Sequence, residues 1–562
     1  MRECNSEAHQ KPFEVLGHET NMATPDARKP SWINYWGWGS GDMLGAGAQA
    51  VITGWLAYFF ITFCGLSPVE TGLILGLPRL LEAITCPLIG YISDNLRHTW
   101  IGRKVGRRKI FLLLTIPLLP SFALIFVSGQ TFTYYLVTFI FFEFVYTMFL
   151  IPWETLAAEM TKDYKEKAKF AGARMLIAQS SAILASYLPT LIINNFGGKD
   201  SSNTFLIMAA IFGGLFSLVV VLVVLFTWER PYTDEEKLIQ PEPMDWGKAA
   251  LIPVNMFRDL FSTLKLKAFR QHLSLYLGGY ISQDIFNTAF PLFVATVMVG
   301  STLVISQAMT MMYFAQLISV MIAIRVIIKT GPTAAYRMAI TFVGAALLLF
   351  LGFYLVKPAG FAAGVEGLHG NIFNAAASGF NPTVLFWLFL PIILAGLGRG
   401  TLNFVPWGVY NYLPDVDEAV TGQRREGIFA GVMTFVRKIA QSGAILLTTT
   451  LLGLGGFVSG GKGQVVQQTS QAIHTLVLIM VGGPILVMLA GMIISWKFRL
   501  NAKTHEVLVH EVERLRAGAT EAESPESKAI VEDLTGWKYE RLWGRGEKAK
   551  PPVGSDQIPD IN

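Results

Sequence analysis

Residues 32–63 read WINYWGWGSGDMLGAGAQAVITGWLAYFFITF, an apolar stretch that contains one carboxylate, Asp42. A second apolar stretch, residues 71–92, contains PRLLEAITCP and carries Glu82. About 20 apolar residues are enough for a helix to cross the hydrocarbon core of a membrane. A carboxylate inside such a helix is costly and usually marks a place where something binds or passes. The two stretches therefore predict a polar pathway through a membrane.

The composition agrees with a membrane protein and excludes several other classes. The chain has 562 residues, of which 52% are hydrophobic and 15% charged, whereas about a quarter of the residues of a soluble domain are charged. The three cysteines are scattered, with neither metal-ligand nor disulfide spacing. No nucleotide-binding loop, histidine-rich metal pattern or nucleophile elbow is present. We expect no enzyme, no cofactor other than a coupling ion, no nucleic-acid partner and a monomer.

Apolar windows between polar breaks predict an all-α membrane protein of twelve helices. The first six are expected at 33–63, 70–95, 109–128, 131–159, 168–195 and 203–228, and the second six at 270–299, 302–328, 335–356, 383–413, 426–455 and 470–497. This order predicts two fused six-helix bundles, 31–228 and 270–497, with an N-terminal tail (1–30), a polar linker (229–269) and a C-terminal tail (498–562). Within the tail, residues 502–516 are expected to form an amphipathic helix.

Lysine and arginine gather in alternate loops. The loop after the second helix holds Arg97, Arg103, Lys104, Arg107, Arg108 and Lys109, and the loop after the fourth helix is also basic. The loops between them, such as SGQ after the third helix, are nearly free of positive charge. Because basic loops stay in the cytoplasm, we expect both termini to be cytoplasmic in a multi-pass protein of the cell membrane.

Four polar or polarisable side chains share one face of the second helix through their spacing: Arg79, Glu82, Thr85 and Cys86. Burial disfavours the charged form of Glu82, whereas a nearby cation favours it. This competition suits a group that binds and releases a proton or an alkali cation. The alternative is that Arg79 and Glu82 form a purely structural pair.

The other candidates would line a substrate site. Asp42 follows small residues that permit close helix contact, and it either accepts hydrogen bonds from sugar hydroxyls or pairs with a neighbouring cation. Trp153 suits stacking on a sugar ring, although membrane aromatics also pack or anchor. Arg174 offers a rigid fork of donors for vicinal hydroxyls or a carboxylate. In the second half, Arg399 and Lys438 lie within membrane segments and serve either a substrate or an internal carboxylate.

Five segments in order carry a resemblance to a known family: GSGD (39–42), RLLEAITCPLIGYISD (79–94), GRRK (106–109), LIPWETLAAEMTKDY (150–164) and TGQRREGIFAGVMTFVRK (421–438). Over residues 31–500 the chain resembles the glycoside–pentoside–hexuronide:cation symporters, the branch of the major facilitator superfamily that includes the melibiose carrier. The resemblance implies two bundles that rock around a central site.

The resemblance also implies roles for particular residues. Glu82, Thr85, Cys86 and Thr147 fall where the family's cation site lies. Asp42, Trp153, Arg174 and Lys438 fall at or near sugar-binding and coupling positions, to which we add Arg399 as a candidate from the residues alone. If Arg174, Arg399 and Lys438 converge, a uronide would be well matched.

Two positions depart from the family pattern. Cys86 stands where a second acid is expected before the proline, and Leu150 where a polar residue usually precedes Ile-Pro. Hard cations such as sodium prefer several oxygen ligands, so one remaining carboxylate favours the proton over sodium. We therefore expect a symporter that imports a sugar or glycoside. An uncoupled facilitator or an exporter of the same fold stays an alternative, and a transporter-like sugar receptor is a more distant one.

Overall fold

The computed structural model describes residues 29–96, 99–161, 164–196, 202–229, 246–367, 381–410, 412–422, 425–461 and 466–543. Every regular element within these ranges is a helix. Residues 1–28 of the predicted N-terminal tail, residues 230–245 of the predicted linker, residues 368–380 and residues 544–562 of the C-terminal tail lie outside the described residues.

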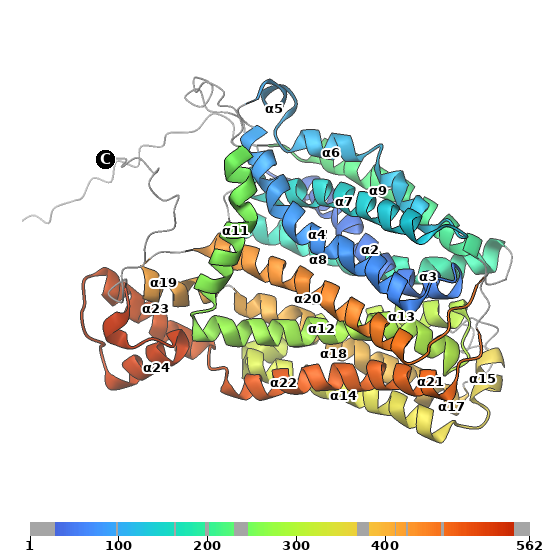
Figure 1. Ribbon diagram of the computed structural model, residues 1–562. Coiled ribbons are helices and arrows are strands. Elements are labelled where there is room, and N and C mark those ends of the chain that lie inside the picture. The colour runs from blue at the N-terminus through green and yellow to red at the C-terminus, as the bar shows by residue number, and fades with distance from the viewer. Residues whose placement is uncertain are drawn as a thin grey trace, which may run out of the picture.

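The first six predicted helices form one bundle (Figure 1). The first is built in consecutive pieces, and the third in two. Their bounds are α1 (Trp32–Gly39), α2 (Asp42–Val51), η1 (Ile52–Leu56), α3 (Ala57–Thr62), α4 (Pro68–Asn95), α5 (Trp100–Val105, a loop helix), α6 (Lys109–Thr115), η3 (Leu119–Phe126), α7 (Phe132–Met160), α8 (Tyr164–Phe196) and α9 (Ser202–Phe226).

The second six predicted helices form the other bundle, and a linker helix and a helical tail accompany them. Their bounds are α11 (Trp246–Thr263, the linker), α12 (Lys267–Thr296), α13 (Thr302–Thr330), α14 (Pro332–Val356), α15 (Phe361–Gly367), α17 (Pro382–Val384), η5 (Leu385–Phe389), α18 (Leu390–Tyr410), α19 (Leu413–Thr421), α20 (Glu426–Leu454), α21 (Ser470–Val477), η6 (Leu478–Gly482), α22 (Gly483–Lys497), α23 (Ala502–Arg516), α24 (Pro525–Thr535) and η7 (Tyr539–Arg541).

The third membrane helix departs from the continuous helix expected at 109–128. Its α-helical part, α6, ends at Thr115, and the chain continues as the tighter 3-10 helix η3. Pro117 and Pro120 lie at this break. Each proline lacks a backbone N–H and clashes with the preceding turn of an α-helix. The prolines therefore explain the break.

Among the described residues, ten helical segments are long and apolar enough to cross a membrane by length and composition. Two of the twelve predicted helices, α12 and α20, fall outside that set. Polar side chains explain why: α12 carries Gln283, Asp284 and Asn287, and α20 carries Arg437, Lys438 and Gln441. The two least apolar helices of the second bundle thus bring charged groups into the interior.

Several hydrogen bonds join the bundles at the end opposite the basic loops, which we call the far end. Hydrogen bonds cross between the bundles there from Tyr58 to Thr302 (3.2 Å), from Ser186 to Thr310 (3.0 Å) and between Thr190 and Ser306 (2.6 Å). The helix pairs α4 with α20 and α8 with α13 carry this interface (Figure 1). The structure is therefore closed at the far end.

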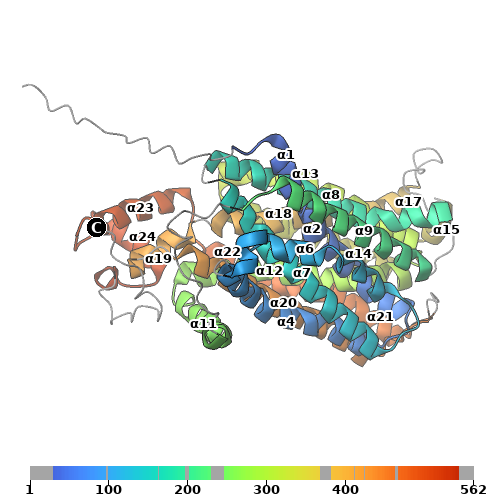
Figure 2. The ribbon, with the colours of Figure 1, turned by 90° about the horizontal axis from the view of Figure 1, so that it is seen from above.

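At the opposite end, which we call the basic-loop end, the tail forms a helical cap on the second bundle. The amphipathic helix expected at 502–516 is α23, and α23 and α24 pack on α19 (Figure 2). The backbone N–H of Trp543 donates to the carbonyl of Ala419 (2.9 Å), and His505 hydrogen bonds with Asp415 (2.8 Å). The linker helix α11 contacts both α4 and α20 at this end.

Candidate functional site

A cluster of charged side chains lies where α4 meets α7 and α20. In the first bundle, Arg79 Nη1 donates to Glu82 Oε2 and to Glu143 Oε2, both at 3.1 Å. The residues are buried, with exposed side-chain fractions of 3% or less. Charges so far from water persist only when they are paired. One arginine therefore holds two buried carboxylates together.

The second bundle adds the fourth member of this cluster. Lys438 of α20 donates to Glu82 Oε1 at 2.6 Å. The Glu82 side chain is fully buried, and that of Lys438 is 15% exposed. Glu82 is thus bonded through both oxygens to cations, one from its own bundle and one from the other. Any movement of the bundles apart at this level must break the Glu82–Lys438 pair.

The predicted coupling residues lie around this cluster. Thr147 is buried and its hydroxyl donates to the carbonyl of Glu143 (2.8 Å), while Thr85 donates to the carbonyl of Glu82 (3.3 Å). Cys86 is buried within electrostatic range of Glu82. Lys438, expected on the substrate side, instead contacts the coupling residue Glu82. The structure thus gathers the predicted cation-site residues around one ion cluster.

Glu143 was missed by the sequence reasoning. It is a single carboxylate within the apolar run of α7 and lies one helical turn before Thr147. The argument that singled out Asp42 and Glu82 applies equally to it. A carboxylate inside an apolar stretch is costly, and this criterion selects Glu143 as well as Asp42 and Glu82 from the sequence.

A second buried ion pair lies on the other side of a small cavity. Arg437 donates to both oxygens of Asp284, at 2.7 and 2.9 Å. A cavity of about 10 Å³ separates this pair from Arg79 and is also lined by Asn287 and Thr288, about the space of one water. Bidentate pairing satisfies Asp284, so it is a fixed element beside the cluster.

The predicted substrate residues Asp42 and Arg174 form a separate group nearer the basic-loop end. Arg174 Nε donates to Asp42 Oδ2 at 3.3 Å, and its Nη2 donates to Glu154 Oε1 at 2.8 Å. Asp42 is buried, but the side chains of Arg174 and Glu154 are 33% and 38% exposed. The Arg174 guanidinium is therefore not fully enclosed by the protein. The arrangement suits hydrogen bonds to hydroxyl groups or to a carboxylate.

Trp153 does not lie where a sugar could stack on it in this conformation. It is completely buried, stacked between Trp38 and Phe149 at centroid distances of 5.2 and 5.5 Å. Its indole N–H donates to the carbonyl of Trp38 (2.8 Å). A side chain on Gly41 would reach within 2.3 Å of the same indole nitrogen. The stacking role is thus replaced by a packing role, with Arg174 positioned over the ring at 4.8 Å.

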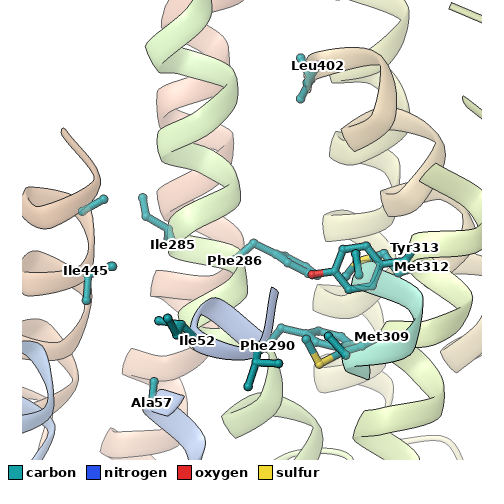
Figure 3. Close-up of a cluster of buried hydrophobic side chains, with 14 of the residues drawn as sticks. Ile52, Ala57, Ile285, Phe286, Phe290, Met309, Met312, Tyr313, Leu402 and Ile445 are labelled. Carbon is teal, nitrogen blue, oxygen red and sulfur yellow. The ribbon is translucent and has the colours of Figure 1, made fainter. Parts of the chain in front are cut away.

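Arg399 is the most isolated of the predicted residues. It is buried in α18, where Nη1 lies 3.6 Å from the sulfur of Met312 and the guanidinium stands 5.4 Å from the Phe286 ring centroid. No described carboxylate lies within ion-pair distance, and Nε has no hydrogen-bond partner. The structure does not bring Arg399 together with Lys438 or Arg174 in an ion network. Figure 3 shows the surrounding apolar cluster, in which Phe286 points toward Tyr313 and Met312.

The known proteins to which this chain is similar are named as transport proteins. The model of the MFS/sugar transport protein family matches residues 37–502. An uncharacterized symporter of Synechocystis sp. is 22% identical over 83% of this chain and 94% of its own length. A glucuronide carrier protein homolog of Escherichia coli is 22% identical over 86% and 96%. A sodium-dependent lysophosphatidylcholine symporter of Danio rerio is 20% identical over 87% and 90%.

Solved structures agree on the fold. The nucleoside transporter NupG superposes with a TM-score of 0.54 at 15% identity, over 82% of this chain and 98% of that one. The predicted fold class, an all-α membrane protein of two six-helix bundles with the major facilitator fold, is confirmed. The chain is a membrane transporter rather than an enzyme, and it belongs to the MFS/sugar transport protein family.

Proposed function

We propose that this protein imports a sugar or glycoside, uronides included, by symport with a cation, and that the proton is the coupling ion. The observation that carries the proposal is the Glu82–Lys438 pair, which joins the two bundles at 2.6 Å inside the membrane region. A cation that binds Glu82 competes directly with Lys438. Cation binding and the separation of the bundles are then one event.

The conformation indicates which side of the site is closed. The far end is closed by hydrogen bonds between the bundles, whereas the side chains of Arg174 and Glu154 are partly exposed. If basic loops are cytoplasmic, this is a state of the alternating-access cycle that is closed on the outer side. In the outward-open state, the far-end hydrogen bonds would be broken and Glu82 would be reached from outside.

Substrate recognition is assigned to Asp42 and Arg174. Asp42 accepts and Arg174 donates, and vicinal hydroxyls of a sugar offer both a donor and an acceptor. Glu154 lies 2.8 Å from the Arg174 guanidinium and balances its charge. A uronide carboxylate would compete with Glu154 for the same guanidinium.

The test is uptake into proteoliposomes over a panel of methyl glycosides, including methyl β-D-glucuronide and methyl α-D-galactoside, under imposed proton or sodium gradients. Accumulation driven by the proton gradient supports the proposal. Accumulation driven only by the sodium gradient would show that sodium, and not the proton, is the coupling ion. Equilibration that neither gradient affects contradicts symport and makes Glu82 a structural partner of Arg79.

A second candidate is symport of an amphiphile with a charged head group. The relative from Danio rerio is named for lysophosphatidylcholine. The second bundle offers a buried guanidinium, Arg399, that has no carboxylate partner among the described residues and lies beside the apolar Phe286 and Met312. Figure 3 shows Phe286 and Met312 within a mixed apolar cluster that also contains Phe290, Met309 and Tyr313. Lysophosphatidylcholine included in the same vesicle panel distinguishes the two candidates.

A further inference from the structure

One carboxylate oxygen of Glu143 is buried without a hydrogen-bond partner, which is energetically costly. Its Oε2 accepts from Arg79 at 3.1 Å, its side chain is 3% exposed, and its Oε1 has no hydrogen-bond partner. Buried polar atoms are nearly always satisfied, and the exceptions often mark sites that accept a ligand. Glu143 therefore brings an open acceptor position to the edge of the ion cluster.

The charges of the cluster balance without any further ion. Glu82 and Glu143 contribute two negative charges, and Arg79 and Lys438 contribute two positive charges. An added cation would leave the cluster with a net charge in a medium of low dielectric, which is unfavourable. The entry of a cation must therefore displace one of the two basic groups.

The geometry decides which basic group leaves. Arg79 is 1% exposed and bonded to both carboxylates on its own bundle. Lys438 is 15% exposed, belongs to the other bundle and bonds to Glu82 alone among the described carboxylates. Lys438 has one bond to break and a flexible stem. Glu143 holds Arg79 in place, so that Lys438 is the exchangeable partner.

We propose that Glu143 and Glu82 together form the cation site, with Arg79 as the fixed counter-charge and Lys438 as the charge that the cation displaces. This rests on the proposed symport. The ligand is a small monovalent cation, either a proton or an alkali ion. The second carboxylate comes from α7 instead of α4, where Cys86 occupies the position one turn after Glu82.

Four other polar or titratable groups lie within electrostatic range of the site. They are Tyr146, Cys86, Asp284 and Glu154. Tyr146 donates to the carbonyl of Gly45 (3.0 Å), and Asp284 is held by Arg437 at two points. Glu154 is bonded to Arg174. Among the described carboxylates in and around the site, Glu143 is the one that has a buried oxygen without a hydrogen-bond partner.

The second carboxylate widens the set of cations that this site could hold beyond the proton of the proposed function. With Cys86 in place of an acid, Glu82 alone would be a poor site for sodium. With Glu143 the site has two carboxylates, which can either share one proton or coordinate an alkali ion. A thermal response to pH alone agrees with the proposed proton, and a response to sodium or lithium would replace the proton as the coupling ion.

The test is thermal unfolding of the purified full-length protein in detergent, which requires no knowledge of the substrate. The cations are NaCl and LiCl against choline chloride at equal ionic strength, and protons over a pH series. A cation that binds only the folded state raises the midpoint, and the stabilisation grows with the logarithm of the cation concentration once that concentration exceeds Kd. The variants are Glu143→Gln, Glu143→Asp and, as a control, Glu506→Gln on the exposed side of α23.

We expect Glu143→Gln to shift the cation response to a concentration higher by about tenfold or more, as for the loss of a group from an ion site. Glu143→Asp should keep a weakened response, and Glu506→Gln should match the wild type. A lower midpoint with an unchanged cation response in Glu143→Gln would show a merely structural role and overturn the assignment. Absence of any response in the wild type would overturn the cation site as a whole.

A transplanted acid makes the test independent of the folding of one variant. The double variant Glu143→Gln/Cys86→Asp keeps the number of charges and places the second acid one turn from Glu82 on the same face of α4. We expect it to recover a cation response that Glu143→Gln lacks. If Glu143→Gln does not fold, the double variant replaces it, and a folded double variant without any response contradicts the proposal.

Discussion

Two ion networks of similar composition lie in the first bundle, and they are built differently. At the basic-loop end, Glu229 accepts the backbone N–H groups of Arg107, Arg108 and Lys109 at 2.7–2.9 Å. Glu159 pairs there with both arginines at 2.5 Å. In the middle of the bundle, Arg79 holds Glu82 and Glu143, and no backbone donor takes part in the bonds described.

The difference between the two networks distinguishes a structural ion network from a functional site. Glu229 sits at the N-terminus of α6, where backbone donors and the helix dipole favour a negative charge, and it fixes the loop. The central cluster keeps an unpartnered oxygen on Glu143 and an unpartnered nitrogen on Arg79, and it is joined to the other bundle through Lys438. The backbone donors on Glu229 fix the basic-loop network within one bundle, whereas the central cluster depends on a side chain of the other bundle and can exchange that partner.

Removal of the charge on Glu82 should have the largest effect on function. In Glu82→Gln, the cation loses its binding group and Lys438 loses its carboxylate, so the cation gradient no longer drives uptake. We expect accumulation to fall to simple equilibration, while exchange of labelled for unlabelled substrate continues. The measurement is paired uphill uptake and counterflow in proteoliposomes, and uphill uptake at the wild-type level would contradict the role of Glu82.

Breaking the satisfied pair in the second bundle should mainly affect stability. Asp284→Ala leaves Arg437 buried without its carboxylate, which costs about 3–5 kcal/mol. The double variant Asp284→Ala/Arg437→Leu removes both charges and should recover most of that loss. Thermal unfolding in detergent measures both variants. Equal stability of the single and double variants would show that the pair is not coupled.

The scaffold network should give a smaller effect that leaves coupling intact. In Glu229→Gln, the neutral amide gives weaker acceptor bonds to the N-terminus of α6, and we expect a loss of about 0.5–2 kcal/mol. Coupled uptake in the folded fraction should resemble that of the wild type. Loss of the proton or sodium dependence in this variant would place the basic-loop network in the coupling mechanism and contradict the comparison.

The exposed Lys528–Glu540 pair of the tail sets the lower limit of the series. Both side chains are largely in solvent, 42% and 63% exposed, and ion pairs of this kind contribute little. We expect Lys528→Ala to leave both the thermal midpoint and uptake unchanged within error. A clear fall in the midpoint would show that the helical cap on α19 depends on this contact.

Most of the fold could be predicted because a membrane helix is recognised by its length and its apolar composition. Apolar windows of sufficient length gave all twelve helices, including α12 and α20, which are the least apolar. The break in the third helix was missed because the windows score hydrophobicity alone, and the paired prolines at 117 and 120 act through the backbone. The docking of α23 and α24 on α19 depends on tertiary contacts and had no signal in a window.

The site was only partly predictable, for a physical reason. Polar residues inside apolar windows identify candidates, and Glu82 and Lys438 were found in this way. Their pairing across 356 residues of sequence depends on how the bundles meet, which no local pattern encodes. Trp153 shows the opposite limit, since a residue suited to stacking on a sugar turned out to fill the space that Gly41 leaves.

The measurement that tests the central claim most directly is reverse coupling. Vesicles without any ion gradient receive an inward gradient of the glycoside that the uptake panel identifies, and luminal pH and sodium are recorded together. We expect substrate entry to carry protons into the lumen in the wild type, and neither protons nor sodium in Glu82→Gln. Cation entry with substrate in Glu82→Gln would contradict this expectation, because the ion would then travel without the carboxylate that joins the two bundles.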